Sequence, residues 1–288
     1  MFTGYALVAL AALMWGLIGP LSKIAFQAGM PTVEVAFWRA SLAWLFYGAH
    51  AIALGRVTIS PRDLGWVLGF GVACIFGLFG SYVLAVREGG AALASVLLYT
   101  APAWVALLAW KILKERLTPL KLVAVATTLT GVAGVCLGNG PGVPGGQMTS
   151  QAIAFGLLAG LSYALYYIFG KTLLSRYATP TIFLYALPVG AACMLPFFSF
   201  GPRPATAWVA CATLALCSTY GAYSLYYAGL RRIEAGRAAI IATLEPVVAA
   251  LLAFSLFGER FTPLGYAGSA LILLAVIITI LGEKRPCT

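Results

Sequence analysis

Residues 101–120 read APAWVALLAWKILKERLTPL, and residues 245–264 read EPVVAALLAFSLFGERFTPL. The two stretches share an early proline, an Ala-Leu-Leu-Ala run, a Glu-Arg pair and a closing Thr-Pro-Leu. They lie 144 residues apart, which is half the length of the 288-residue chain. The same shift aligns residues 77–138 with 221–282 without a gap, and 20 of the 62 pairs are identical. Aligned proline, glutamate, arginine and threonine do not follow from apolar composition, so the chain contains an internal repeat.

The composition around this repeat indicates a membrane protein. Apolar residues make up 62% of the chain and charged residues only 9%, whereas a soluble domain carries about 25% charged residues. A helix needs about 20 apolar residues to cross the hydrocarbon layer, so the chain is long enough for about ten crossings. The predicted spans are Tyr5–Ala28, Val33–Leu54, Leu64–Val86, Ala91–Leu113, Pro119–Gly138, Gln151–Leu174, Pro180–Phe200, Ala205–Leu230, Gly236–Phe257 and Pro263–Leu281.

The basic residues predict the orientation of these spans. With the N-terminus in the cytoplasm, 13 Lys and Arg residues fall on the inner side and five on the outer side, namely Lys23, Arg39, Arg87, Arg203 and Arg260. Excess Lys and Arg mark cytoplasmic loops. We therefore expect a multi-pass protein of a bacterial inner membrane with both termini cytoplasmic.

Five crossings in each half make the two repeats inverted relative to each other. The predicted fold class is an all-α membrane protein of ten transmembrane helices, with repeats at residues 1–138 and 151–288 joined by an outer linker at 139–150. Inverted repeats are typical of secondary transporters, whose substrate site lies near the midplane where the halves meet. This arrangement predicts a carrier.

The sequence lacks the residues that nucleic-acid-binding proteins, metalloproteins and several enzyme classes need. The net charge of +10 is spread in ones and twos between apolar runs, so nucleic-acid binding is not expected. Five of the six cysteines fall inside apolar segments and none forms a CxxC pair, which predicts free thiols and no metal site. His50 is the only histidine and Asp63 the only aspartate, and no GxSxG or P-loop motif is present. We expect no enzyme activity, no catalytic residues and no cofactor.

Aromatic and hydroxyl side chains on equivalent helices are the candidates for a substrate cavity. Such a cavity, between the first, third and fourth helices and their partners six, eight and nine, suits amino acids or similar amphiphiles. The alternative is that these aromatics only pack or form interfacial belts. The predicted lining residues are Trp15, Tyr82, Ser95, Tyr99, Tyr163, Tyr223, Tyr226 and Thr243.

Pro102 and Pro246 occupy equivalent positions near mid-membrane and are candidates for gating. A proline there predicts a kink that releases the carbonyl four residues earlier, at Leu98 or Ala242. The released carbonyls could accept from a substrate ammonium, or the kink could serve packing alone.

Glu245 is the acidic residue placed near mid-membrane, where an acidic side chain costs on the order of 2.5–3.5 kcal/mol. Two interpretations stay open. Either it titrates in coupling or meets the substrate ammonium, or it fixes the ninth helix as a hydrogen-bonded element.

Glycine pairs with small-xxx-small spacing predict close helix packing, either within one subunit or at a dimer seam through the fifth or tenth helix. The pairs are Gly65/Gly69, Gly134/Gly138 and Gly156/Gly160. A monomer or a weak homodimer is expected.

The repeated proline, Glu-Arg and Thr-Pro pattern resembles the drug/metabolite transporter superfamily in its ten-helix form with two EamA-type repeats. Leu244–Thr262 fits the family pattern more closely than Ala101–Thr118, which has Lys114 where glycine is usual and Ala101 opposite Glu245. The aromatic interior also resembles the aromatic amino acid exporter group (YddG type). The resemblance implies export from the cytoplasm.

The function predicted from the sequence is a secondary transporter that exports amino acids, aromatic and other neutral ones, by alternating access. The alternatives are a carrier of another small metabolite (a nucleoside, drug or sugar derivative) and a membrane scaffold without transport activity.

Overall fold

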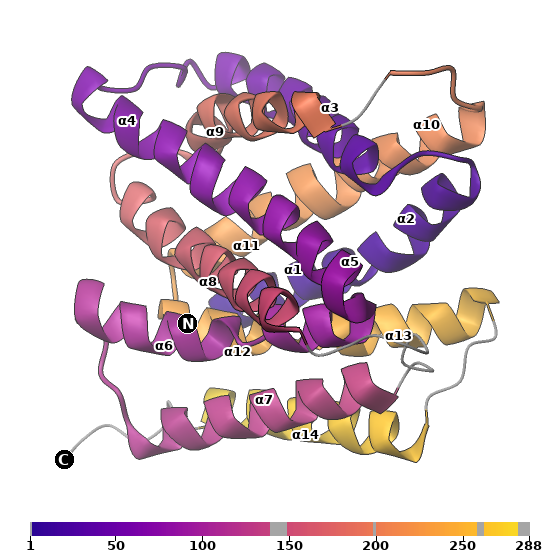
Figure 1. The fold of residues 1–288 in the computed structure, drawn as a ribbon. Coiled ribbons are helices and arrows are strands. Elements are labelled where there is room, and N and C mark those ends of the chain that lie inside the picture. Colours follow the sequence, from indigo (N-terminus) through magenta and orange to yellow (C-terminus); the bar gives the residue numbers. More distant parts are fainter. Residues whose placement is uncertain (1, 139–148, 198–199, 258–261, 282–288) are drawn as a thin grey trace.

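A computed structural model describes residues 2–138, 149–197, 200–257 and 262–281 (Figure 1). Every regular element in these ranges is helical. The first half contains α1 (Phe2–Gly16), α2 (Ile18–Gln27), α3 (Thr32–Ala53), α4 (Pro61–Phe70), the π-helix η1 (Gly71–Phe76), α5 (Gly77–Leu98), α6 (Ala101–Ile112) and α7 (Pro119–Gly138). The second half contains α8 (Ser150–Leu173), α9 (Thr179–Met194), the 3₁₀ helix η2 (Leu195–Phe197), α10 (Ala205–Thr213), the π-helix η3 (Leu214–Gly221), α11 (Ala222–Leu230), α12 (Ala235–Ala242), α13 (Leu244–Phe257) and α14 (Pro263–Leu281).

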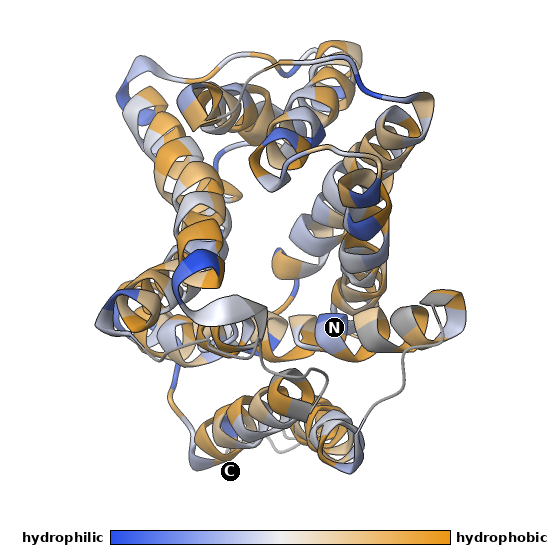
Figure 2. Ribbon diagram, turned by 45° about the vertical axis from the view of Figure 1, so that its right-hand side comes forward, coloured by the Kyte–Doolittle hydropathy of each residue, from blue (hydrophilic) through white to orange (hydrophobic). Residues whose placement is uncertain are grey.

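Eight helices in the described residues are long and apolar enough to cross a membrane, and Pro119–Val135 is apolar but shorter. The eight are Phe2–Gln27, Pro61–Gly90, Leu93–Ile112, Ser150–Leu173, Thr179–Phe197, Ala205–Leu230, Ala235–Leu256 and Pro263–Leu281. The remaining long helix, α3, carries Glu34, Arg39 and His50, which lower its hydropathy. Hydrophobic residues cover most of the helices in Figure 2 and hydrophilic ones gather near turns. The count of ten spans stays a prediction.

Contacts between the halves follow a two-fold pattern. α1 packs on α11 and α13, and the equivalent α8 of the second half packs on α5 and α6. The self-equivalent pairs α3 with α9 and α7 with α14 also pack together. In Figure 1, α7 and α14 run side by side below α6, α12 and α13. Each contact made by a helix of one half therefore has an equivalent contact made by the corresponding helix of the other half, as expected for related repeats.

Helix interruptions are sharper than the sequence predicted. At both prolines, where the sequence predicted a kink, the helix is interrupted. One helix ends at Leu98 and the next begins at Ala101, and a second break falls at Thr243 between α12 and α13. Pro102 and Pro246 lie in the first turn of the new helix, where a missing N–H needs no intrahelical partner. The clash of a proline ring with the preceding turn therefore ends the earlier helix.

Side chains and close packing satisfy the backbone at these breaks. The hydroxyl of Thr100 donates to the Leu97 carbonyl at 2.6 Å. The hydroxyl of Thr243 likewise donates to the Ile240 carbonyl at 2.5 Å. The Leu98 carbonyl, which the sequence predicted to be free for a ligand, lies against Gly160 of α8. The first break is therefore packed into the protein, as non-helical backbone at membrane depth must be.

Glycines allow α7 and α14 to touch through their backbones. A Cβ added at Gly268 would overlap the Gly131 carbonyl oxygen and the Val135 amide nitrogen, and one at Gly134 would approach the Gly268 Cα within 2.9 Å. These contacts lie within one chain. Gly65 and Gly69, by contrast, have nothing within 4 Å of an added Cβ, so their spacing serves no contact within the subunit.

We expect Gly268→Ala to destabilise the protein by about 1–3 kcal/mol, because the new methyl group forces two backbones apart. The measurement is thermal unfolding of detergent-solubilised protein by fluorescence-detected size-exclusion chromatography. Gly69→Ala is the matched control, since the added methyl meets open space and alanine favours the helix. Equal unfolding temperatures for the two variants would contradict the close packing of α7 on α14.

Candidate functional site

A cavity of about 280 Å³ lies between the two halves of the chain. Aromatic rings form much of its wall, and the charged side chains among its described lining are Arg39 and Glu245. The lining residues are Trp15, Ile18, Gly19, Arg39, Leu78, Phe79, Tyr82, Ser95, Leu98, Tyr99, Tyr163, Tyr166, Tyr223, Glu245 and Ala249.

Most of the residues singled out in the sequence meet at this cavity. Seven line it: Trp15, Tyr82, Ser95, Tyr99, Tyr163, Tyr223 and Glu245. Four do not: Tyr226, Thr243, Pro102 and Pro246. The seven come from six spans of both halves, so the fold and not the local sequence brings them together.

Packing explains the four residues that lie off the cavity. Tyr226 is fully buried, with ring centroids 5.2 Å from Trp15 and 5.3 Å from Tyr167. Thr243 is 2% exposed and its hydroxyl is used at the helix break. Pro102 and Pro246 shape the breaks behind the wall. Tyr226 was predicted because it aligns with Tyr82 across the repeat, but the two halves have different conformations here.

Hydroxyl groups form hydrogen bonds along the polar part of the cavity wall. Tyr82 and Ser95, on either side of the turn at Gly90, are joined through their hydroxyls at 3.0 Å. Tyr99 and Tyr163 both hydrogen-bond the side chain of Glu245. The carboxylate is therefore held from both halves while part of it still faces the cavity.

Arg39 is the site residue that the sequence prediction missed. In the sequence it was counted only among the outer-side basic residues, whereas it lies on the cavity wall within α3, with 7% of its surface exposed. Its Nε donates to the Thr219 hydroxyl at 2.7 Å and its Nη2 to the Tyr223 hydroxyl at 3.3 Å. The guanidinium also lies 5.2 Å from the centroid of the Phe79 ring. An arginine inside an apolar segment was the available signal, since such residues face a protein interior or a cavity.

Two π-helices occupy equivalent places in the halves. Gly71–Phe76 of η1 aligns with residues 215–220 of η3 under the repeat shift. The cavity residues Phe79 and Tyr82 follow the first, and Tyr223 follows the second. A π-helix changes the direction in which later side chains point, and such segments are frequent at functional sites.

A wider vestibule of about 630 Å³ shares Ile18, Gly19, Arg39, Phe79 and Tyr82 with the cavity. It extends to Phe26, Thr32, Val86, Phe155 and Phe197, which lie near the ends of their helices. These ends lie a full span away from the start of α1. The cavity is thus reached from the end of the bundle opposite the start of α1.

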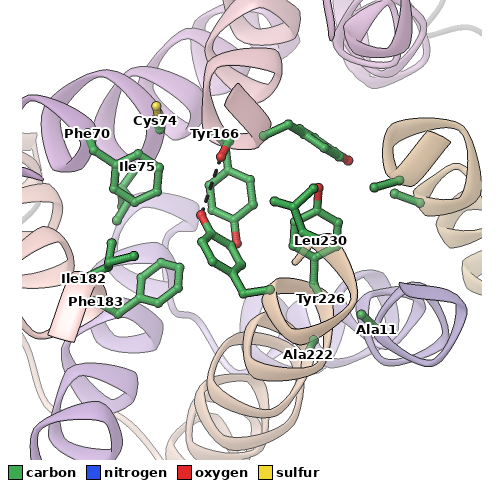
Figure 3. Close-up of a cluster of buried hydrophobic side chains, with 14 of the residues drawn as sticks. Ala11, Phe70, Cys74, Ile75, Tyr166, Ile182, Phe183, Ala222, Tyr226 and Leu230 are labelled. Carbon is green, nitrogen blue, oxygen red and sulfur yellow. Dashed lines mark hydrogen bonds between the residues drawn. The ribbon is translucent and has the colours of Figure 1, made fainter. Parts of the chain in front are cut away.

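Packed aromatics close the other end of the cavity. Tyr166, Tyr167, Tyr226 and Tyr227 are each at most 2% exposed and contact one another with centroids 5.3–6.0 Å apart. Figure 3 shows Tyr166 and Tyr226 with Phe70, Phe183 and Leu230 in this cluster. These rings leave little exposed surface, so the vestibule is the approach to the cavity that the described residues show in this conformation.

An ionic cluster lies beyond these aromatics and joins the two halves. Lys121 contacts Glu115 at 3.1 Å and Glu234 at 3.3 Å, and it is 7% exposed. The Glu115 carboxylate accepts from the Ala235 amide at 2.6 Å and the Gly236 amide at 3.2 Å. A carboxylate at the first amides of α12 is stabilised by the helix dipole. The cluster therefore fastens the closed end.

No group of three His, Cys, Asp or Glu side chains that could hold a metal ion occurs within the described ranges. His50, which the sequence left without a partner, lies near the end of α3, and its Nδ1 is 3.1 Å from the Tyr220 hydroxyl. The cavity itself offers a ligand an aromatic surface with two opposite charges, Arg39 and Glu245.

The EamA-like transporter family model matches residues 2–137 and 150–281. An uncharacterized transporter of Archaeoglobus fulgidus is 30% identical over 96% of this chain and 95% of its own length. A probable amino-acid metabolite efflux pump of Salmonella typhimurium is 26% identical (96% and 95%), and a probable terminal-alkyne amino-acid exporter of Streptantibioticus cattleyicolor is 27% identical (96% and 97%). A solved crystal structure with 17% identity superposes with a TM-score of 0.85 over 99% of both chains, which shows the fold.

The chain therefore belongs to the EamA-like transporter family and is a multi-pass integral membrane transporter. The family expected from the repeated Glu-Arg and Thr-Pro pattern is confirmed. The narrower resemblance to the aromatic amino acid exporter group stays a prediction.

We expect Tyr99→Ala to leave the fold intact and Tyr226→Ala to destabilise it by about 3–5 kcal/mol, because only Tyr226 fills a fully packed core. Thermal unfolding in detergent measures both variants against the wild type. Equal losses of stability would mean that Tyr99 is also a packing residue and that the cavity wall is wrongly placed there.

Proposed function

We propose that this member of the EamA-like transporter family exports amino acids, aromatic and other neutral ones, across a bacterial inner membrane by alternating access. The observation that carries the proposal is the position of Glu245. Its carboxylate faces an aromatic cavity between the two halves and is held there by Tyr99 and Tyr163. A carboxylate in such a place attracts a substrate ammonium, and the rings offer apolar surface to a side chain.

The size and chemistry of the cavity favour small amphiphiles. About 280 Å³ is at the lower end of ligand pockets, which suits one amino acid. Trp15, Tyr163 and Tyr223 supply rings from both halves. The names of two relatives, an amino-acid metabolite efflux pump and an amino-acid exporter, agree with this substrate class.

Different environments of equivalent residues support alternating access. Gly77, Phe79, Gly80, Tyr82 and Val83 of α5 line the open vestibule. Under the repeat shift, their counterparts are Gly221, Tyr223, Ser224, Tyr226 and Tyr227, of which Tyr226 and Tyr227 are sealed in the aromatic cluster. If each half adopted the conformation of the other, the open and closed ends would exchange. The ten-helix count and a monomeric carrier, or a weak homodimer, are part of this proposal.

The proposal predicts counterflow of amino acids in proteoliposomes. Vesicles loaded with unlabelled phenylalanine should accumulate external labelled phenylalanine transiently, whereas vesicles loaded with a nucleoside or a sugar should not. Protein-free vesicles are the control for leakage. Counterflow with a nucleoside, drug or sugar derivative alone would favour the other-metabolite carrier, and no counterflow with any compound would favour a scaffold.

The proposed orientation places both termini in the cytoplasm and the 139–150 linker outside. Most of that linker lies outside the described residues, and Thr149 is its first described position, at the start of α8. In a cysteine-free background, Thr149→Cys should react with a membrane-impermeant maleimide in intact cells. Ser175→Cys, in the connection after α8, should react only after permeabilisation. The reversed pattern would overturn the proposed export direction.

A further inference from the structure

Arg39 is a buried charge that forms no ion pair with any described residue. Its side-chain hydrogen bonds to described residues go to the neutral hydroxyls of Thr219 and Tyr223. None of the ion pairs among the described residues includes Arg39 or Glu245. An ionised group inside an apolar segment normally has a charged partner or faces a cavity. Glu245 lines the same cavity but forms no ion pair with Arg39, so the guanidinium can take an anionic partner from a ligand.

The donors that remain on Arg39 have the geometry of a carboxylate receptor. A guanidinium has five N–H donors, and one on Nε and one on Nη2 are used. Among the described residues, both Nη1 donors and one Nη2 donor have no partner, and N–H groups on Nη1 and Nη2 can together bind a carboxylate in bidentate fashion. The residue lines both the cavity and the vestibule, so a ligand has access to these donors.

Glu245, which carries the opposite charge, lines the same cavity but belongs to the other half of the chain. Arg39 belongs to α3, Glu245 belongs to α13, and the charge of Arg39 acts on Glu245 across the cavity. Phe79 and Tyr223, which are equivalent under the repeat shift, contact the guanidinium from either side. The aromatic wall thus separates one cationic point from one anionic point.

We propose that Arg39 binds the substrate carboxylate while Glu245 binds its ammonium, so that the site selects zwitterions. This inference rests on the proposed function and assigns to Arg39 a role that Glu245 alone does not provide. The bound carboxylate takes the donors that Thr219 and Tyr223 leave unused. An amine without a carboxylate leaves Arg39 unpaired, and an acid without an ammonium leaves Glu245 unpaired, and both are therefore rejected.

The charge pair also fixes the direction of the substrate. Under the repeat shift Glu245 corresponds to Ala101, and α9, the counterpart of α3, contains no arginine, so neither charge has a symmetric copy. A substrate held between two unique charges keeps its carboxylate toward α3 and its ammonium toward α13 when the halves exchange conformations. The substrate is consequently carried without turning over.

The experiment uses three matched compounds in competition with phenylalanine counterflow in proteoliposomes: phenylalanine itself, 2-phenylethylamine, which lacks the carboxylate, and 3-phenylpropionate, which lacks the ammonium. For the wild type, both truncated compounds should compete at least about tenfold more weakly than phenylalanine, as expected for a lost charge-assisted hydrogen bond.

Variants assign each charge to one end of the substrate. Arg39→Gln should weaken competition by phenylalanine about 10- to 100-fold and leave competition by 2-phenylethylamine unchanged. Glu245→Gln should weaken competition by phenylalanine similarly and leave competition by 3-phenylpropionate unchanged. Arg39→Lys keeps the charge without the bidentate fork, so a smaller loss confined to carboxylate-bearing compounds is expected even if Arg39→Gln does not fold. Arg87→Gln is the control, because Arg87 is an exposed arginine away from the cavity.

Two outcomes would overturn the inference. In the first, Arg39→Gln weakens competition by phenylalanine and by 2-phenylethylamine equally, which would make Arg39 a structural residue. The wild type could also accept 2-phenylethylamine as well as phenylalanine, which would show that no carboxylate is recognised. In both cases wild-type phenylalanine counterflow persists. Failure of the proposed function itself is distinct, because it appears as absence of amino-acid counterflow in the wild type.

Discussion

Hydrocarbon offers no hydrogen bonds, so every interruption of a membrane helix needs partners from the protein itself. The chain interrupts its helices repeatedly, at Leu17, Gly90, Tyr99–Thr100 and Thr243 and within the two π-helices. Several of these places border the cavity, and others are covered by a neighbouring helix. Threonine hydroxyls donate to a backbone carbonyl at two of the breaks, and Gly160 lets α8 pack closely against the first of them. The same breaks allow side chains to reach the midplane, so the site depends on how the backbone is satisfied.

The second constraint is the asymmetry imposed on a symmetric fold. The packing of α1 on α11 is repeated by α8 on α5, yet the first arrangement seals its aromatics and the second borders the open vestibule. The Glu115 carboxylate caps α12 and binds Lys121, which holds the halves together at the closed end. A buried ion pair of this kind adds little net stability, but its loss leaves charges uncompensated.

The architecture was readable from the sequence because it rests on long periodic features. Apolar runs of about 20 residues and an ungapped internal repeat predicted the helices and the family, and the family is confirmed. Seven candidate residues meet at one cavity because repeat-related tyrosines and midplane positions mark inward faces. Four details were not predicted. The π-helices contain no proline, the breaks precede the prolines, and Tyr226 differs from its counterpart Tyr82 through the conformation of its half. Arg39 was counted only among the outer-side basic residues and was not considered as a lining residue.

Trp15 gives the site an optical property of its own. Its indole lines the cavity, its Nε1 has no hydrogen-bond partner among the described residues, and its ring lies 5.9 Å from Tyr223 and 5.2 Å from Tyr226. Excitation absorbed by these tyrosines passes to the indole, whose emission wavelength responds to the polarity around it. Any solute that enters the cavity changes the surroundings of the indole. Because the chain has seven tryptophans, a variant that keeps Trp15 alone would report occupancy of the cavity as a spectral shift without a chemical label.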